Sequence, residues 1–247
     1  MQQLVKDVLN HRKKNDIREV DLLQSVADLV NKGKYNFKEL VEDVFNIFVD
    51  NIIHSYGTLL FCLYELASNK QIQQCVIEEL VRLKPDNNKS LQLESLRQLP
   101  YLDAVVKETL RKYPAVPTII RKCNEHCSIN GEGFGFELPK GTLLFYSVMG
   151  VHRDPSNYPD PNKFDPDRFI EAVNKQCDTS DTYYMPFGID NTKNIGLRFT
   201  TLHIKLSLIS IFTKYKVKLN NVCPLEFDNK KLPLFPKEPV PICFESL

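Results

Sequence analysis

The stretch from Asn36 to Asn69 limits the possible folds of this chain more than any other part of the sequence. Near the centre of this stretch, apolar residues occupy most sides of a helix rather than one stripe; they are Ile47, Phe48, Val49, Ile52, Ile53, Leu59, Leu60 and Phe61. A helix that is apolar nearly all round is typical of the buried core of a large protein. The sequence therefore predicts one long central helix around which the other elements pack.

The other elements are predicted from periodicity and from proline and glycine breaks. The expected helices cover Val5–Lys32, with an interruption near Asn15 and Asp16, Gln71–Leu83, Pro100–Lys112 and about Gly196–Tyr215. The expected strands cover Thr118–Lys122, Ser128–Ile129 and Leu143–Ser147, and the tail from Lys216 to Leu247 is expected to form a terminal hairpin. The predicted class is α+β, mainly α, in one partial domain over 1–247, with a helical part over 1–114 and a mixed part over 115–247.

Charge and cysteine content exclude some classes of function. Lysine and arginine number 32 against 31 acids, so the chain as a whole has no field that would attract nucleic acid. Seven scattered cysteines without a secretory signal indicate reduced thiols in a cytosol-facing protein. Cys123 and Cys127, with His126 between them, resemble a metal-ligand pair, but no second pair lies at zinc-ribbon spacing, which favours a polar strand edge. No uninterrupted apolar run is long enough to span a membrane, so no anchor is expected.

A set of motifs follows the central helix in a fixed order. Glu108 and Arg111 lie one turn apart on the helix that Pro114 stops, a pattern that alone usually means a surface ion pair. The later segments are His152-Arg153-Asp154-Pro155, Tyr158-Pro159-Asp160-Pro161, Phe164-Asp165-Pro166-Asp167-Arg168-Phe169, Pro186-Phe187-Gly188 and Ile195-Gly196-Leu197-Arg198-Phe199. This ordered set resembles the C-terminal half of a cytochrome P-450, and the local sequence of the motifs is most similar to that of insect microsomal members.

The resemblance implies a role for several residues. Glu108, Arg111 and Arg168 would form the buried triad that locks the loop before the haem segment. A haem cofactor is implied, with the binding positions falling on Arg121, Phe187, Gly188, Lys193 and Gly196. Arg121 would pair with a haem propionate, unless it is an ordinary exposed strand residue. The positions that resemble substrate-facing loops are Val116, Ile119, Ile120, Leu234 and Phe235, whose apolar character suits core packing equally well.

The haem segment departs from the family pattern at its most diagnostic position. In F-x-x-G-x-R-x-C-x-G, Phe187 and Gly196 fit, whereas Asp190, Thr192 and Asn194 occupy the glycine, arginine and cysteine positions. A cysteine thiolate binds iron as an anion and favours O–O cleavage, and a neutral amide cannot do so. The metal-ligand position is therefore expected to be non-functional, and Lys193 is a partial replacement for the lost arginine.

The central helix carries a second departure. The family's A-G-x-[D/E]-T-[T/S] falls on Asp50 to Ser55, which places Ile53 at the acid position and His54 at the alcohol position. The acid and alcohol organise proton delivery to oxygen in the family, and Ile53 can neither hold nor relay a proton. Ser55 remains of the set, and His54 raises the alternative of distal iron ligation, against the commoner case of an ordinary core histidine.

Three hypotheses follow. The leading one is a truncated or degenerate P-450-like protein, a pseudoenzyme without standard monooxygenase activity. The second is a haem-dependent monooxygenase that oxidises small hydrophobic compounds with electrons from an NADPH-cytochrome reductase. The third is a non-catalytic scaffold that pairs with a chain covering the exposed central helix, because the family's anchor and first helices are expected to be missing. The expected location is cytoplasmic or peripheral at the endoplasmic reticulum.

Overall fold

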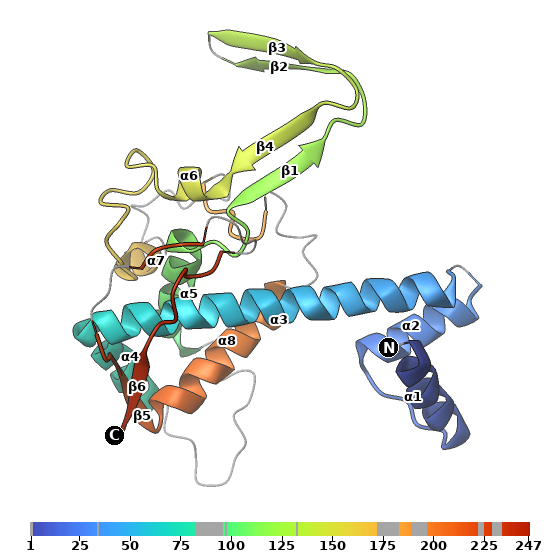
Figure 1. Cartoon of the computed structure of the whole chain (residues 1–247), viewed down its shortest axis with the longest axis horizontal. Helices are drawn as coiled ribbons and strands as arrows, with labels where there is room; N and C mark the ends of the chain where they lie inside the picture. Colours follow the sequence, from blue (N-terminus) through green and yellow to red (C-terminus); the bar gives the residue numbers. More distant parts are fainter. Residues whose placement is uncertain are drawn as a thin grey trace. The chain divides into compact units, whose positions relative to one another are not determined.

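A 32-residue helix, α3 (Phe37–Ser68), occupies the stretch predicted to form the central helix in a computed structural model of the chain (Figure 1). The structure describes residues 2–33, 35–82, 96, 98–131, 133–171, 183–188, 197–221, 225–228 and 234–247. The chain divides into two units, Met1–Ile53 and His54–Leu247, and the boundary falls within α3. Each unit is therefore described by itself.

The first unit contains α1 (Gln2–Lys14), α2 (Leu22–Asn31) and the N-terminal part of α3. Asp21 caps α2, because its carboxylate accepts a hydrogen bond from the backbone N–H of Gln24 at 2.8 Å. Arg12 of α1 binds the same carboxylate through both of its terminal nitrogens, at 2.9 and 2.5 Å. These bonds, the one from Arg12 first, lower the pKa of Asp21 to about 2. One carboxylate thus starts α2 and joins it to α1.

The second unit has its main core between the C-terminal part of α3 and three further helices. These are α4 (Lys70–Arg82), α5 (Pro100–Lys112) and α8 (Leu197–Phe212). Apolar side chains from all four form one buried cluster, including Cys62, Leu66, Val76, Leu80, Leu102, Val105, Ile204, Leu208 and Phe212. At about 1.5–3 kcal/mol for each large buried side chain, this cluster is the main source of stability in the unit.

The N-terminus of α5 is fixed by a side chain from another helix. Pro100 occupies the start of α5, where a missing N–H costs nothing, and the preceding Leu99 provides no side-chain cap. Glu79 of α4 instead accepts hydrogen bonds from the backbone N–H groups of Tyr101 and Leu102, both at 2.8 Å. The carboxylate also lies at the positive end of the helix dipole. The position of α5, which carries the candidate site, therefore depends on α4.

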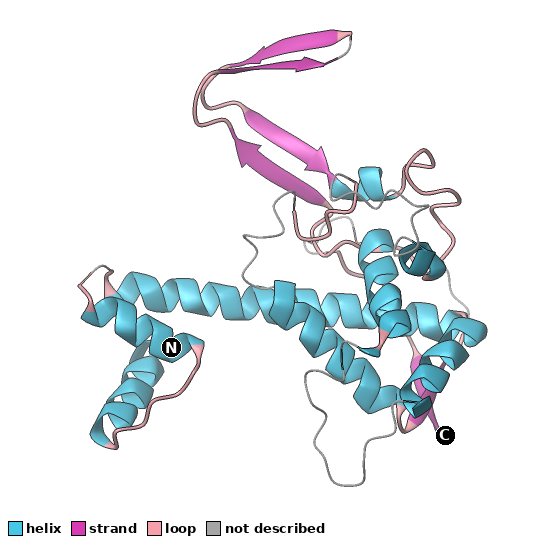
Figure 2. Ribbon diagram, turned by 180° about the vertical axis from the view of Figure 1, so that it is seen from behind, coloured by secondary structure: helices cyan, strands magenta, loops and turns pink. Residues whose placement is uncertain are grey.

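Within the described residues, the strands form three two-stranded antiparallel ribbons (Figure 2). β1 (Thr118–Lys122) pairs with β4 (Leu143–Ser147), β2 (Cys127–Gly131) with β3 (Phe134–Leu138), and β5 (Tyr215–Leu219) with β6 (Ile242–Ser246). The first two ribbons follow one another end to end in Figure 1. Two short helices, α6 (Val148–His152) and α7 (Asp167–Glu171), lie in the segment after β4. The predicted class, α+β and mainly α, is confirmed.

Some elements differ from the sequence prediction. β3 was not predicted, because Gly135 at its second position weakens the strand pattern. The helical stretch expected over Val5–Lys32, with an interruption near Asn15 and Asp16, is two helices, and the break begins after Lys14, where Asp16 has a positive φ of 52°. In the tail hairpin, β5 and β6 pair although they are far apart in the sequence, and Tyr215 lies opposite Ser246. The local pattern located most elements, but it did not locate β3 or show which strands pair.

One helix in the described part of the chain, α3, is long and apolar enough to cross a membrane by length and composition. The sequence prediction of no spanning segment considered only uninterrupted apolar runs. It therefore did not count α3, which contains a few charged residues. Of its most apolar 18-residue window, 33% is buried in the protein. A central core helix passes the same test, so the finding alone does not assign α3 to a membrane.

Candidate functional site

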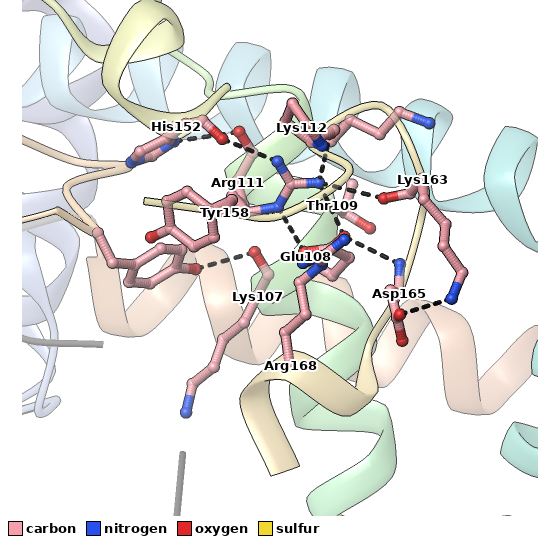
Figure 3. Close-up of polar contacts among 12 residues, drawn as sticks. Lys107, Glu108, Thr109, Arg111, Lys112, His152, Tyr158, Lys163, Asp165 and Arg168 are labelled. Atoms are coloured by element: carbon pink, nitrogen blue, oxygen red, sulfur yellow. Dashed lines mark hydrogen bonds and ion pairs between the residues drawn. The ribbon is translucent and has the colours of Figure 1, made fainter. Parts of the chain in front are cut away.

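The site is centred on a buried ion pair within α5. Glu108 and Arg111 both have 0% exposed side chains, and Arg111 Nε and Nη2 donate to the two carboxylate oxygens at 2.6 and 2.8 Å (Figure 3). Helical spacing of three residues places the two groups on one face, and the planar guanidinium matches the carboxylate in a two-point contact. The lone E-x-x-R pattern, usually a surface pair, is here a fully buried one.

Arg111 uses its remaining donors on the backbone of the segment after β4. Nη1 donates to the carbonyl oxygen of His152 at 2.8 Å, and Nη2 donates to the carbonyl oxygen of Pro161 at 2.9 Å. The guanidinium also lies over the ring of Tyr158, 5.2 Å from its centre. A single side chain of α5 therefore holds three points along residues 152–161.

Glu108 and Arg168 fix the next part of the same segment. The Glu108 carboxylate accepts the backbone N–H of Asp165 at 2.9 Å, and Arg168 Nε lies 3.6 Å from it. Arg168 Nη2 donates to the carbonyl oxygen of Asp160 at 3.1 Å. Burial raises the pKa of Glu108, and the hydrogen bond and charge of Arg111 oppose that rise. The structure thus brings the three residues of the expected triad together around one carboxylate (Figure 3).

His152 joins this centre to the segment that leads to Phe187. The imidazole is fully buried; Nδ1 lies 3.1 Å from the carbonyl oxygen of Arg111, and Nε2 lies 2.9 Å from the backbone nitrogen of Met185. The carbonyl requires an N–H at Nδ1, and the Met185 N–H requires an acceptor at Nε2, so the ring is the neutral Nδ1-H tautomer. Burial lowers the pKa of His152 to about 4, in keeping with that form.

The next turn of the same segment covers the C-terminus of α5. Arg153 Nη2 donates to the carbonyl oxygen of Lys112 at 2.7 Å, and its guanidinium lies over the rings of Tyr113 and Phe227, 5.9 and 5.6 Å from their centres. A cation at a helix C-terminus is favourable because the unpaired carbonyl groups there carry partial negative charge. His152 and Arg153 therefore cap α5 while Arg111 holds the segment that bears them.

The expected haem-contact residues lie only partly within the described residues. Gly188 is buried with a φ of +108°, a backbone conformation that side chains rarely adopt. A Cβ at this position would lie 3.7 Å from Arg121 Nη2 and 3.7 Å from Ile119 Cδ1. The structure therefore brings Phe187-Gly188 and Arg121 together. Lys193, Asn194 and Gly196 lie outside the described residues.

The residues present suit the propionate groups of a haem but not its iron. Arg121 is exposed, and its guanidinium donates to the carbonyl oxygen of Ile120 at 3.1 Å, so its charge can also receive a carboxylate such as a propionate. The sequence pattern predicts Asn194 at the ligand position, and a neutral amide is not the anionic sulfur donor that this class of haem site uses. An amide at that position does not fit a haem thiolate.

The apolar positions expected to face substrate are divided between core and surface. Ile119 is buried with Val148 and Met185, and Val116 packs against the same cluster. Leu234 is buried with Phe61 and Tyr113, whose rings stack 4.6 Å apart. Ile120 is 55% exposed on the opposite face of β1, and the Phe235 ring lies 6.2 Å from that of Tyr56. A substrate-facing role for these residues stays a prediction.

The expected oxygen-activation positions on α3 are partly buried. His54 is half-buried and Ser55 is 1% exposed. The hydroxyls of Ser55 and Thr58, one turn apart on α3, are buried without a hydrogen-bond partner in the described part of the chain. Buried hydroxyls normally have a partner in the protein or in ordered water. Thr58 was not singled out in the sequence, where a threonine in an apolar helix gives no functional signal.

Sequence reasoning also missed His152, Arg153 and Met185 as parts of the site. The signal was present for His152 and Arg153, because they open the His-Arg-Asp-Pro segment that carries the resemblance. Met185 contributes only its backbone N–H, which no side-chain motif can indicate. Within the described ranges, no group of three or more histidine, cysteine or acidic side chains is placed to hold a metal ion.

Comparisons with known proteins give a consistent result. The sequence model of the family described as Cytochrome P450 matches residues 1–244. Cytochrome P450 6A1 of Musca domestica is 35% identical over 94% of this chain, and Probable cytochrome P450 6a13 of Drosophila melanogaster is 32% identical over 98%. These matches cover 48% and 50% of the two relatives. The chain therefore spans about half the length of the curated relatives it matches.

Proposed function

Since this chain belongs to the cytochrome P450 family, we propose that it is a degenerate member that keeps the family's structural centre without haem-thiolate monooxygenase activity. The family implies a haem cofactor, and the proposal concerns what this chain can do with one. We also propose that 1–247 act together as one partial domain. Its helical part would be 1–114 and its mixed part 115–247.

The proposal rests on the contrast between the Glu108–Arg111 pair, which is kept, and the expected iron-ligand position, where the cysteine is replaced. Glu108 and Arg111 are fully buried and fully hydrogen-bonded, so the support for the segment leading to Phe187 is intact. The position that this support would present to iron is Asn194. An amide carries no negative charge and supplies no electron density for O–O cleavage. A chain that keeps the buried ion pair but lacks the thiolate ligand is expected to keep the fold without the catalysis.

The proton-delivery positions support the same conclusion. Ile53 replaces the acid of the family pattern and has no ionisable group. Ser55 keeps a hydroxyl, but one hydroxyl without an acid cannot supply protons from solvent. We propose that His54 does not take over this role and that His54 and Ser55 are structural residues of α3. Two independent parts of the chemistry are thus missing from the chain.

The direct test is a turnover assay on the purified chain loaded with haem and mixed with NADPH and a cytochrome reductase. We expect no oxidised product from a small hydrophobic probe above the background of free haem with reductase. The matched variant is Asn194→Cys, which restores the thiolate and leaves Ile53 in place. Product from the wild-type chain, at a rate that Asn194→Cys does not exceed, would contradict the proposal and favour the monooxygenase hypothesis.

A second candidate function, a non-catalytic binding scaffold, is favoured by exposed apolar residues on α3. Phe45, Phe48 and Ile52 recur along the helix and are 40%, 58% and 47% exposed. Such a stripe is unusual on a monomer and is typical of a contact surface. We propose that a covering chain, rather than the reductase, is the partner this surface requires. The proposed location stays peripheral at the endoplasmic reticulum.

Sedimentation of the purified chain tests the scaffold function. We expect species heavier than the 28.6 kDa monomer, because exposed phenylalanines associate in water. Phe48→Glu should shift the distribution toward the monomer, whereas Glu39→Gln on the same helix should not. A wild-type chain that stays monomeric at every concentration would remove this candidate.

A further inference from the structure

Two cysteines, Cys123 and Cys127, lie side by side where the β1–β4 ribbon meets the β2–β3 ribbon. Their Sγ atoms are 3.6 Å apart; Cys127 is exposed and Cys123 is half-buried. The other free cysteines of the described residues, Cys62, Cys75 and Cys243, have no such sulfur contact. The pair belongs neither to the site around Glu108 nor to any role proposed above.

The backbone holds the two sulfurs together. Cys123 extends the first ribbon, since its N–H donates to Thr142 at 2.9 Å and its carbonyl accepts the N–H of Gly141 at 2.8 Å. Cys127 begins the second ribbon, opposite Leu138. Only three residues separate the two cysteines. Their approach is therefore fixed by two hydrogen-bonded ladders rather than by a flexible loop.

The surrounding groups do not complete a metal site. His126 Nε2 lies 3.0 Å from the carboxylate of Glu137, so the neighbouring imidazole and carboxylate contact each other. No set of three potential ligands occurs in the described residues, and two thiols do not fill the four positions that zinc takes in proteins. The chemistry available to the pair is that of two adjacent thiols.

We propose that Cys123 and Cys127 form a reversible oxidation site, in which the two thiols close to a disulfide that ties the end of β1 to the start of β2. A disulfide requires the sulfurs to approach to about 2.05 Å, which from 3.6 Å is about 1.5 Å of movement. Both side chains are at the surface or partly so, and rotation about their bonds can supply the movement. The bond would fix the joint between the two ribbons.

Hydrogen peroxide is a sufficient oxidant, and the reaction balances. The exposed Cys127 sulfur attacks one peroxide oxygen, the O–O bond breaks, and the released hydroxide takes the thiol proton to form water. The Cys123 sulfur then attacks the Cys127 sulfenic acid, the S–S bond forms, and the S–O bond breaks with release of a second water. The two thiols lose two electrons in total, and the peroxide gains them.

Peptide mapping of the full-length chain tests the proposal. Trypsin cleaves after Lys122 and Lys140, and the peptide 123–140 contains both cysteines and no other. After treatment with hydrogen peroxide, we expect this peptide to lose both sites of alkylation and to be lighter by two hydrogen atoms. Reduction with a dithiol should restore both sites. Cys75→Ser, which changes an exposed single cysteine, should leave this result unchanged.

Two further results decide the matter. In Cys123→Ser, Cys127 should be trapped as a sulfenic acid or a mixed disulfide, because its resolving partner is missing. The proposal is overturned if the 123–140 peptide of the oxidised wild-type chain keeps both alkylation sites while other cysteines react. A bond from Cys123 or Cys127 to a different peptide would overturn it equally. Cys123 lies at the end of a ribbon and outside the hydrophobic clusters, so Cys123→Ser removes no core contact.

Discussion

Replacing Arg111 with leucine should lower the free energy of unfolding by about 3–5 kcal/mol, the range for breaking a buried ion pair from one side. Glu108 would be left as a buried charge without its two-point partner, since both side chains are 0% exposed. The carbonyl groups of His152 and Pro161 would lose their donors as well. Urea unfolding followed by circular dichroism measures the change.

Two further variants distinguish the loss of the two-point Glu108–Arg111 contact from the loss of any charged side chain on α5. Arg111→Lys keeps the charge but loses the planar fork, so we expect most of the loss to remain. Lys107→Ala removes the half-exposed pair with Asp103 on the same helix and should cost at most about 1 kcal/mol. An Arg111→Leu loss as small as that of Lys107→Ala would show that the triad does not hold the fold together.

Acidification should destabilise the chain through His152, by about 3 kcal/mol between pH 6.5 and pH 4. The pKa of His152 falls from the ordinary 6.5 to about 4 on folding, because burial disfavours the charged ring. As the pH falls below 6.5, the unfolded chain takes up the proton first, so stability falls until the folded form also titrates near pH 4. Above pH 6.5 the contribution is complete and constant.

Comparison with His152→Gln isolates this contribution. Burial raises the pKa of Glu108, so that residue binds a proton more readily in the folded state and titrates in the opposite sense. The measured quantity is therefore the difference in unfolding free energy between the wild type and His152→Gln at each pH. We expect that difference to shrink from pH 6.5 to pH 4. A difference that does not change with pH would mean that His152 is not held neutral by the fold.

The parts of this protein that follow from local patterns were predictable. The apolar stretch at Ile47–Phe61 indicated α3, and Pro114 marked the end of α5, because helix periodicity and proline act over a few residues. The order of the later motifs indicated the family, which the comparisons confirm. The three triad residues were named because each has a charged side chain within a motif.

The parts that depend on backbone contacts at long range were not predictable. Glu79 caps α5 from 22 residues away, and the His152 ring is held by backbone atoms of Arg111 and Met185. Gln73 similarly bonds the backbone of Leu66 and of Val217, 144 residues later. Backbone groups are the same in every residue, so the sequence carries no sign of which of them a side chain will reach.

We propose that this chain cannot present a thiolate to haem iron, and the absorption spectrum of the haem-loaded, reduced protein with carbon monoxide shows whether it does. Thiolate ligation gives this family its red-shifted band, and free haem with carbon monoxide serves as the reference. We expect either no retained haem or a spectrum without that band, because Asn194 is a neutral amide. Appearance of the red-shifted band in the wild-type chain would show that a thiolate binds the iron and that the proposal is wrong.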